Sequence, residues 1–556
     1  MENNKNSFFN NLKFDLSSGL VVFFVALPLC LGISATSTSY EGIEGVVDHP
    51  VGLIMPGLIA GIIGGIVVGF LSGSRYGVSG PAAGLITIVT AAIIEFGGVQ
   101  AGGFEKFALA VALGGVIQFI FGLIRAGFVA YYIPFSVIKG MLAGIGITIF
   151  LKELPHFFGY DKDPEGDMAF NQVDGHNTIE ELGFAFENVH WGATIIAFIS
   201  LIVLIIWGLN FVKKNKVLSL IPGPLLAIVI SVGVSALFMG TDLSLVAEPT
   251  EAVIDATTGQ LAEPEPVKHL VDVPTPSNFD EFKAMFYFPN FSAISDPAVW
   301  RVALVIALVA SIESLLCVEA TDKMDPNKGR TPMNRELRAQ GIGNLFSGLL
   351  GGLPITQVIV RSTANIGAGA KTKMSAIIHG IFLLAFILAI PGVLNLIPRA
   401  TLAAVLLLIG WKLASPKSII AMVKSGWAQW VPFFTTIGVM LFTDLLKGVF
   451  AGLIIAFLII LYRNFKMSFF LNDESADGKV HLKLSQHTTF LNKASIMKRL
   501  DTIKEGKEVV IDLSETISID YDVKEAINDF IEGAEDRDIK IELIHGEKLE
   551  QAKMSH

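Results

Sequence analysis

Two ionisable side chains stand inside stretches that are otherwise apolar enough to lie in a membrane. Arg361 occurs in GGLPITQVIVRSTANIGAG (351–369), and Glu313 occurs in WRVALVIALVASIESLLCVEA (300–320). A charge at the centre of a bilayer costs at least roughly 2.5–3.5 kcal/mol on insertion scales, so such residues mark substrate sites, ion sites or internal pairs. We therefore expect Arg361 to compensate a bound anion. The alternative is a structural salt bridge between Arg361 and Glu313.

The stretch around Arg361 also contains residues that interrupt a helix. GGLP precedes TQVIVRSTANI, and a second interruption, SGP (79–81), precedes AAGLITIVTAAIIEF. The first N–H groups of a helix lack intrahelical partners and carry a partial positive charge of roughly +0.5. Two helices that begin inside the membrane can offer these groups to one anion. Alternatively, the glycines and prolines only kink packed helices. The candidate anion ligands are Ser79, Gly80, Ala82, Ala83, Gln357, Val358, Ile359 and Arg361.

Glu313 is the candidate residue for a coupling ion. A carboxylate within the membrane can carry a proton or hold a cation, so coupling to H+ or to Na+ stays open. The two cysteines, Cys30 and Cys317, lie in apolar runs without the spacing of metal ligands, and we expect them to pack as small apolar residues. The sequence predicts no catalytic residue, metal site, cofactor or nucleic-acid partner.

The composition is that of a polytopic membrane protein. Of the 556 residues, 52% are hydrophobic and only 17% are charged, whereas soluble domains carry roughly 25% charge. Several apolar runs reach the roughly 20 residues that cross a bilayer. We predict fourteen α-helical transmembrane segments at 16–38, 51–71, 79–96, 107–125, 128–151, 190–211, 217–239, 297–320, 336–353, 355–367, 372–391, 393–411, 428–446 and 448–465.

The order of these segments predicts two inverted repeats of seven. The two interrupted segments are the third and the tenth, which are corresponding positions in such repeats, and short interrupted segments at matching positions point to a midplane binding site. Gly57, Gly61, Gly65 and Gly69 recur at every fourth residue in the second segment. That spacing favours a helix-packing ridge, and we expect no ligand there.

Loop charges predict the orientation. The basic clusters KKNK (213–216), KMDPNKGR (323–330) and KTK (371–373) fall on the side of the N-terminus. The long loops 152–189 and 240–296 fall on the other side and include acid-rich stretches. Because basic short loops stay cytoplasmic, we expect a multi-pass protein of the cell (inner) membrane with both termini in the cytoplasm.

The composition changes abruptly after the last apolar segment. KVHLKL alternates like a strand, ASIMKRLDTI has helical spacing, EVVIDL is a buried-strand pattern, and VKEAINDFIEGAEDR precedes IKIELI. This alternation predicts a small cytoplasmic α/β domain. We place the membrane domain at 1–466 and the α/β domain at 467–556.

Five motifs in order resemble the SulP family of anion transporters with a C-terminal STAS domain. They are VALP in the first segment, SGPAAG in the third, SIESLL in the eighth, GGLPITQVIVRSTANI in the tenth, and the later IDLSETISID. The resemblance implies a core domain (segments 1–4 and 8–11) that moves against a gate domain (segments 5–7 and 12–14), usually in a homodimer. It also implies a basic residue near the anion at the position of Arg361.

The chain departs from the patterns of the family that it resembles at several positions. Relatives that couple bicarbonate to Na+ have a small Gly-Ala-Thr cluster where this chain has Gln357, Val358 and Ile359. Cys317 stands where a hydroxyl could help to hold Na+, and hard cations prefer oxygen ligands, so proton coupling or exchange gains support. Leu29 makes the first break apolar. Tyr521 follows Asp520 where a STAS phospho-switch needs Ser or Thr, which favours a structural or dimer-organising role.

The best-supported function is secondary active transport of a small inorganic anion, with bicarbonate or sulfate favoured. A passive anion channel or an anion exchanger of the same fold is the alternative, as is a nucleobase permease of related architecture. A permease would not explain Arg361 or the terminal domain. An ATP-driven pump is disfavoured because no GxxxxGK[ST] occurs, and an enzyme is disfavoured because neither HExxH nor GxSxG occurs.

Overall fold

The computed structural model describes most of the chain as two compact units, Met1–Leu453 and Ile454–His556, and each is described by itself. The basic cluster KKNK (213–216) and most of the acid-rich stretch YDKDPEGD (160–167) lie outside the described residues. The described residues are 3–40, 46–47, 49, 52–162, 170, 176–209, 211–212, 218, 221–246, 253–254, 261–262, 269–276, 278–466, 469–472 and 479–544.

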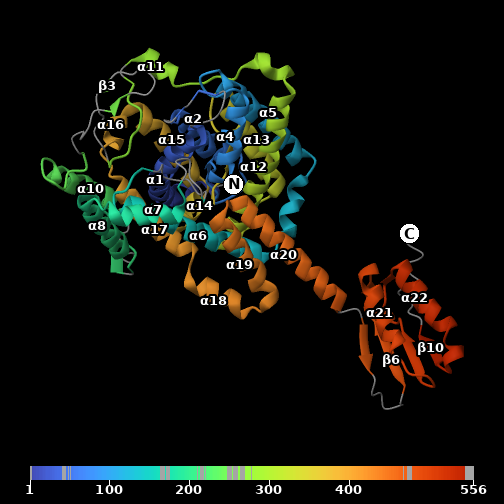
Figure 1. The fold of residues 1–556 in the computed structure, drawn as a ribbon. Helices are drawn as coiled ribbons and strands as arrows, with labels where there is room; N and C mark the ends of the chain where they lie inside the picture. Colours follow the sequence, from blue (N-terminus) through green and yellow to red (C-terminus); the bar gives the residue numbers. More distant parts are fainter. Residues whose placement is uncertain are drawn as a thin grey trace. The chain divides into compact units, whose positions relative to one another are not determined.

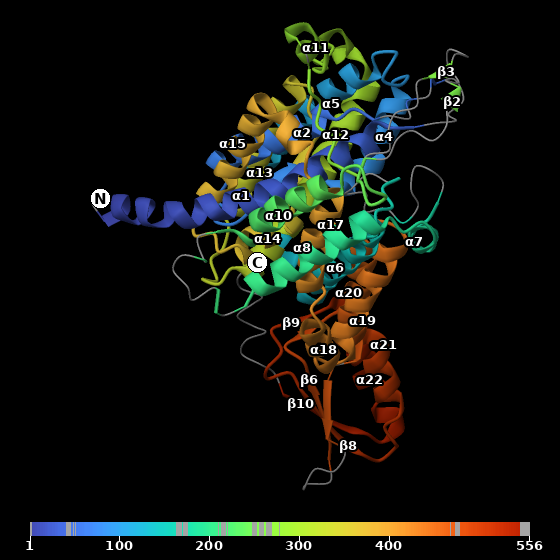
Figure 2. The same cartoon turned by 90° about the vertical axis from the view of Figure 1, so that its left-hand side faces the viewer.

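One set of helices in the first unit, here called the first packing group, is built around α5 and α1. Helix α5 packs on α12 and α13 (Figure 1), and α1 packs on α2, α14 and α15 (Figure 2). The members are α1 (Asn3–Thr38), α2 (Met55–Ile63), α3 (Gly69–Leu71), α4 (Ile86–Glu95), α5 (Gly103–Leu123), α12 (Pro297–Met324), α13 (Met333–Leu349), α14 (Ile359–Gly367) and α15 (Met374–Ala389).

The glycines of the predicted ridge explain the close approach of these helices. An added Cβ at Gly61 would lie 2.5 Å from Cys30 Sγ on α1, and one at Gly65 would lie 2.6 Å from Gly380 Cα on α15. Gly57 and Gly69 also face α1 and α15. Small residues let helix backbones approach in a membrane, so the predicted packing role of this ridge is confirmed. The π-helical turn η1 (Gly64–Val68) connects α2 to α3.

The remaining helices of the first unit form the second packing group, which is centred on α6. Helix α6 packs on α17 and α19, and α8 packs on α10 and α17. The members are α6 (Phe135–Phe157), α7 (Thr178–Glu187), α8 (Trp191–Trp207), α10 (Gly223–Phe238), α17 (Arg399–Leu413), α18 (Pro416–Lys424), α19 (Trp427–Phe442) and the start of α20 (Leu445–Lys466).

Short elements connect the two groups. The 3-10 segment η3 (Ala126–Tyr132) joins α5 to α6, and α16 (Pro391–Leu394) joins α15 to α17. Between α10 and α12 lie the hairpin of β2 (Val253–Ile254) and β3 (Leu261–Ala262), the helix α11 (Phe279–Ala284) and the 3-10 segment η5 (Phe291–Ser295).

The helices match the predicted apolar segments in position. Each of the fourteen predicted segments contains a helix. Within the described residues, six helices are long and apolar enough to cross a membrane, or seven if α7 and α8, bent by 109°, form one span. Several shorter apolar helices accompany them, such as Met55–Leu71 and Ala83–Glu95. The chain is thus a multi-pass membrane protein, and the number fourteen stays a prediction.

A buried cluster beyond the end of α6 ties three parts of the chain together. His156 Nδ1 lies 2.7 Å from Asp161 Oδ1, and His269 Nδ1 lies 2.7 Å from Asp161 Oδ2. The ring of His269 lies 4.4 Å from that of His190, which precedes α8. The N–H of Arg399, at the start of α17, donates to the carbonyl of His269 over 3.0 Å. The cluster therefore fixes the ends of α6, α8 and α17 to one another.

We expect Asp161→Asn to lower the melting temperature of the purified protein by several degrees. Burial raises the pKa of Asp161, but hydrogen bonds from His156 and His269 outweigh burial and hold that pKa below its ordinary value. A carboxyl group whose pKa is lowered by folding stabilises the fold at pH values above its unfolded-state pKa, near 3.9. This stabilisation is lost as the pH falls through the folded-state pKa. Melting curves from pH 2 to pH 7 should show a full difference at pH 7 that shrinks as the pH falls below about 4. Equal melting temperatures at pH 7 would contradict this.

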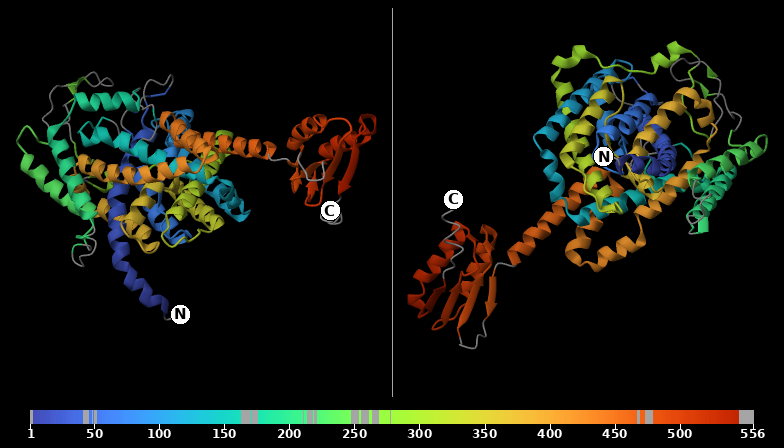
Figure 3. Two further views of the ribbon diagram at one scale, coloured as in Figure 1. Left: turned by 90° about the horizontal axis from the view of Figure 1, so that it is seen from below. Right: turned by 180° about the vertical axis from the view of Figure 1, so that it is seen from behind.

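The second unit contains the predicted α/β elements. Strands β5 (Phe469–Asn472), β6 (Val480–Leu484), β8 (Glu508–Asp512) and β10 (Lys540–Ile544) form a sheet of order β10-β8-β6-β5, in which β5 pairs antiparallel and the others pair parallel. Helices α21 (Lys493–Asp501) and α22 (Tyr521–Glu532) cover one face of this sheet (Figure 3). A second parallel pair joins β7 (His487–Thr488) to β9 (Ser518–Ile519).

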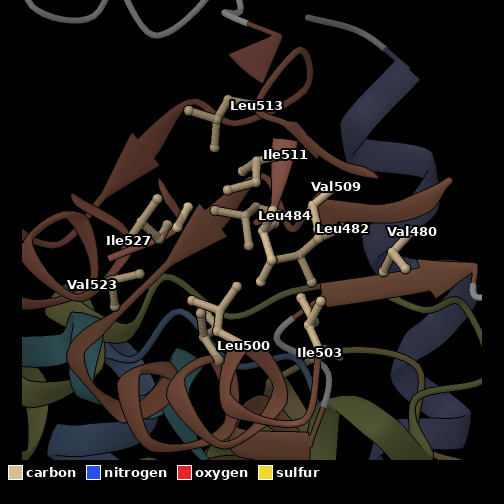
Figure 4. Close-up of a cluster of buried hydrophobic side chains, with 13 residues drawn as sticks. Val480, Leu482, Leu484, Leu500, Ile503, Val509, Ile511, Leu513, Val523 and Ile527 are labelled. Atoms are coloured by element: carbon tan, nitrogen blue, oxygen red, sulfur yellow. The ribbon is translucent and has the colours of Figure 1, made fainter. Parts of the chain in front are cut away.

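Alternation along the strands builds the core of this unit. Val480, Leu482 and Leu484 of β6 point to the same cluster as Leu500 of α21 and Ile527 of α22 (Figure 4). This arrangement agrees with the expected STAS fold. The unit begins inside α20, whereas the composition changes at the end of that helix.

The start of α22 is the position where the STAS resemblance implies a phosphorylation site. The carboxylate of Asp520 caps α22 by accepting a hydrogen bond from the N–H of Asp522 over 3.1 Å. The next residue, Tyr521, is 77% exposed. The expectation of a structural rather than a phospho-switch role stays a prediction.

Candidate functional site

Each of the two interrupted segments contains one short strand just before its helix begins. Strand β1 (Ser79–Pro81) pairs antiparallel with β4 (Ile355–Gln357), with Ser79 opposite Gln357. The N–H of Val358 extends this ladder by donating to the carbonyl of Val78 over 2.9 Å. Both predicted interruptions are thus confirmed, and the extended backbone finds its hydrogen-bond partner in the other interrupted segment.

The helices that follow these strands begin beside one cavity of about 70 Å³. The segment after β1 passes through the 3-10 turn η2 (Ala83–Leu85) into α4, and the segment after β4 passes into α14. Neither Ala82 nor Val358, the residues at the two N-caps, has a side chain that caps the first N–H groups. Two of these donors face α12 instead: the N–H of Gly84 donates to the carboxylate of Glu313, and the N–H of Ile359 donates to Cys317. A ligand would use the other N–H groups of the two starts or displace these contacts. The cavity is lined by Leu29, Ile33, Ala82, Ala83, Gly84, Ile86, Thr87, Ile145, Thr148, Glu313, Cys317, Val358, Ile359, Val360, Met440, Asp444 and Leu445.

The cavity lies between the two packing groups. Helices α1, α4, α12 and α14 of the first group supply one wall, and α6, α19 and α20 of the second group contribute Ile145, Thr148, Met440 and Leu445. A site in this position changes its exposure when one group moves relative to the other. Five of the predicted site residues line it: Ala82, Ala83, Val358, Ile359 and Glu313.

Arg361 does not line the cavity. Its side chain lies on the side of the β1–β4 pair that faces away from the cavity. Its side chain is fully buried, and Nη2 lies 3.3 Å from Cys30 Sγ. The guanidinium packs so closely on the backbone of Gly80 that a side chain there would collide with Nη1. Its Nε and Nη1 have no hydrogen-bond partner, and no ion pair among the described residues joins Arg361 to Glu313 or another carboxylate. The alternative of a salt bridge to Glu313 is therefore wrong.

Three further predicted ligands lie with Arg361 in or behind the strand pair. The hydroxyl of Ser79 accepts a hydrogen bond from Gln340 Nε2 over 2.8 Å, and Gln357 Nε2 donates to Thr321 Oγ1 over 3.0 Å. Gly80 contacts the guanidinium as described. These residues fix the strands that position the two helix starts, and a direct role of theirs in anion binding stays a prediction.

Glu313 of α12 lies at the start of η2–α4, where its carboxylate accepts a hydrogen bond from the N–H of Gly84. It is 5% exposed, and an added Cβ on Gly84 would lie 3.0 Å from its Oε1. Its Oε2 is buried without a hydrogen-bond partner. Cys317 lies one turn further along α12 and lines the same cavity. The carboxylate thus stands beside the first turn after β1 with one oxygen available to a proton or a cation.

Several lining residues were not among the predicted site residues. Thr148 of α6 is buried, and its hydroxyl has no partner. Asp444 lies between α19 and α20, where it pairs with Lys447 at 2.8 Å. An acid in FTDLLKG between two apolar segments was a visible signal for Asp444. Thr148 stands in an unbroken apolar helix and gave no such signal.

Comparison with known families gives the class of the protein. The model of the Sulfate permease family matches residues 12–436, which is most of the chain. The chain belongs to the sulfate permease family. The family is made up of transporters, so the chain is a membrane transporter and not an enzyme.

Two relatives differ in the anion that their names give. YvdB of Bacillus subtilis, named as a sulfate transporter, is 29% identical over 81% of this chain and 73% of its own length. The bicarbonate transporter BicA of Picosynechococcus is 26% identical over 72% of this chain and 62% of its own length. Together they support anion transport and leave the particular anion open.

A solved structure extends the likeness to nearly the whole fold. The murine Slc26a9 anion transporter has a TM-score of 0.63 to this chain, with 16% identity, and the match covers 97% of this chain and 87% of that one. The likeness supports the predicted fold of an anion-transporter membrane domain followed by a STAS domain.

Proposed function

We propose that the chain is a secondary active transporter of a small inorganic anion, with sulfate or bicarbonate favoured, and that the anion binds in the cavity between the starts of η2–α4 and α14. The N–H groups of both starts supply hydrogen-bond donors, of which those of Gly84 and Ile359 face Glu313 and Cys317 until an anion displaces these contacts. The partial positive charges of the two helix starts add at the point where they meet. The names of the relatives support the two anions.

The observation that carries this proposal is the buried charge of Arg361. A fully buried guanidinium without a carboxylate partner is costly, and it lies directly behind the strands that lead into both helix starts. A bound anion on the cavity side of the strands would compensate this charge. Arg361 then acts by its charge across the strand pair, without contact with the anion.

The two packing groups supply the movement that alternating access requires. We propose that the first group is the core that carries the anion and that the second is the gate. Because the cavity has lining residues from both groups, sliding of one against the other opens it to one side and closes it to the other.

Glu313 is the proposed carrier of a coupling proton. The carboxylate lies against Gly84 at the start of η2–α4, so a negative charge on Glu313 competes with the anion for the same donors. Protonation removes this competition and favours anion binding. A cation held by the free Oε2 would act in the same direction, which keeps Na+ as the alternative coupling ion.

Uptake by proteoliposomes tests the proposed function. Vesicles that contain the purified full-length chain should accumulate labelled sulfate or bicarbonate, and not succinate, when an inward proton gradient is imposed. A parallel series with an inward Na+ gradient at equal pH separates the two coupling ions. Uptake that only equilibrates the anion and ignores both gradients would identify a channel or an exchanger instead.

A further inference from the structure

A second pocket, here called the basic pocket, lies at the opposite end of α12 from its N-terminus and shares no residue with the anion cavity. It has a volume of about 550 Å³ and is formed by the end of α12, the loop that leads to α13, and η3. Its lining residues are Tyr131, Glu319, Asp322, Lys323, Lys328, Gly329, Arg330, Thr331 and Met333.

The two acids of the basic pocket already have partners. Glu319 Oε1 lies 3.1 Å from Lys323 Nζ. Asp322 accepts hydrogen bonds from both the N–H and the hydroxyl of Thr331, over 2.6 Å and 2.7 Å. Lys323 therefore compensates the charge of Glu319, whereas Asp322 is bound to uncharged groups and keeps its negative charge.

The remaining cations of this region have no carboxylate partner among the described residues. Lys328 and Arg330 are exposed, and within the described residues no salt bridge includes either of them or the neighbouring Lys139. The ammonium groups of Lys139 and Lys323 lie over the same ring, that of Phe135, at 5.6 Å and 6.0 Å. The lining cations Lys323, Lys328 and Arg330 outnumber the two lining carboxylates. The pocket therefore keeps a small net positive charge that suits an anionic group with several oxygens.

The loop holds these cations in a defined conformation. The carboxylate of Asp325 accepts hydrogen bonds from the N–H groups of Asn327 and Gly329, over 2.6 Å and 3.0 Å. Lys328 between them has a φ of 53°, in the left-handed region that non-glycine residues rarely adopt. Such a conformation persists only where its surroundings impose it, and it is common at ligand sites.

Exposed aromatic residues place the mouth of the pocket at the surface of a bilayer. Tyr131 lines the pocket and is 65% exposed. Its neighbours Phe128, Tyr132 and Phe135 are also exposed, as are Leu123 and Ile124 at the end of α5. Aromatic side chains of membrane proteins gather at the depth of the lipid headgroups, and basic pockets between helices at that depth bind anionic headgroups.

We propose that the basic pocket binds the phosphate-bearing headgroup of an anionic lipid, with Lys328 and Arg330 as its principal contacts. The aromatic residues beside the pocket favour a lipid over a free phosphate, because a soluble anion would gain nothing from them. This site is separate from transport and lies on the loop that the charge pattern assigns to the cytoplasm.

Native mass spectrometry of the full-length protein tests this proposal. The detergent-solubilised protein should retain phosphatidylglycerol in preference to phosphatidylcholine. The double variant Lys328→Gln, Arg330→Gln should bind phosphatidylglycerol about tenfold more weakly. The matched double variant Lys417→Gln, Lys424→Gln loses the same charge from exposed positions on α18 and should bind it as the native protein does.

Further arms separate the remaining outcomes. Glycerol phosphate and inorganic phosphate should displace the lipid poorly; displacement at equal concentration would assign the pocket to a soluble phosphate and overturn the lipid. Unchanged lipid retention in the Lys328, Arg330 double variant would overturn the site. Equal melting temperatures of the two double variants in phosphatidylcholine would show that the loss is not unfolding. If the Lys328, Arg330 double variant melts at the lower temperature, the single variant Arg330→Gln decides whether the pocket binds the lipid. A smaller loss of phosphatidylglycerol binding is expected for it.

Discussion

Replacement of Arg361 by methionine is expected to lower anion uptake about thirty-fold in a protein that still folds. Methionine keeps a long, flexible side chain in the space between α14 and Gly80 but removes the charge. A unit charge roughly 8 Å from an anion, at an effective dielectric constant of about 20, contributes about 2 kcal/mol, which corresponds to about thirty-fold in affinity. Initial rates of uptake into proteoliposomes at equal protein content measure this loss.

A matched variant separates the effect of the lost charge from a non-specific effect on the folded structure. Arg301 of α12 is exposed and pairs with Glu95, so Arg301→Met removes an arginine far from the strand pair and should leave uptake nearly unchanged. Native uptake in the Arg361→Met protein would assign Arg361 to structure alone. A strongly lowered melting temperature together with lost uptake would have the same meaning.

Glu313→Gln is expected to abolish accumulation driven by a proton gradient while it spares exchange of one anion for another. Glutamine resembles the protonated acid, so the anion site should remain competent, but the side chain can no longer release a proton. Uptake with and without a pH gradient gives the driven component, and efflux of labelled anion into unlabelled medium gives the exchange component.

The matched variant for this test is Glu319→Gln. Glu319 lies on the same helix, partly exposed and paired with Lys323, and its replacement should leave the proton-driven component intact. If uptake follows external Na+ at fixed pH and ignores the proton gradient, the proton assignment is wrong and Glu313 holds the cation instead. A Glu313→Gln protein that transports like the native one would remove Glu313 from coupling altogether.

Much of the fold follows from local chemistry that the sequence displays. Proline and glycine in SGP and GGLP disfavour a helix, so both interruptions could be placed within a few residues. The break predicted beside Leu29 is wrong, because α1 continues through Pro28. Apolar length placed the helices, alternation placed β6 of the second unit, and a continuous apolar run placed β8. The pairing of β1 with β4 could not be predicted, because it depends on two segments that lie far apart in the chain.

The candidate site was harder to predict than the fold. The direction of a side chain turns by about 100° per residue along a helix, so the face occupied by Arg361 depends on the residue at which α14 begins. Because α14 begins at Ile359, Val360 lines the cavity and Arg361 lies on the side away from it. Thr148 reaches the cavity only because the two packing groups meet there, which no local pattern encodes.

Binding of labelled anion to a variant with a filled cavity tests the central claim most directly. Ala83→Phe places a ring in a space of about 70 Å³ that cannot also hold an anion, whereas Val229→Phe adds the same ring at a position on α10 that is 60% exposed. The purified native protein and the Val229→Phe protein should bind labelled sulfate or bicarbonate saturably, and the Ala83→Phe protein, folded by its melting curve, should not. Saturable binding of native strength to the folded Ala83→Phe protein would show that the anion site lies elsewhere.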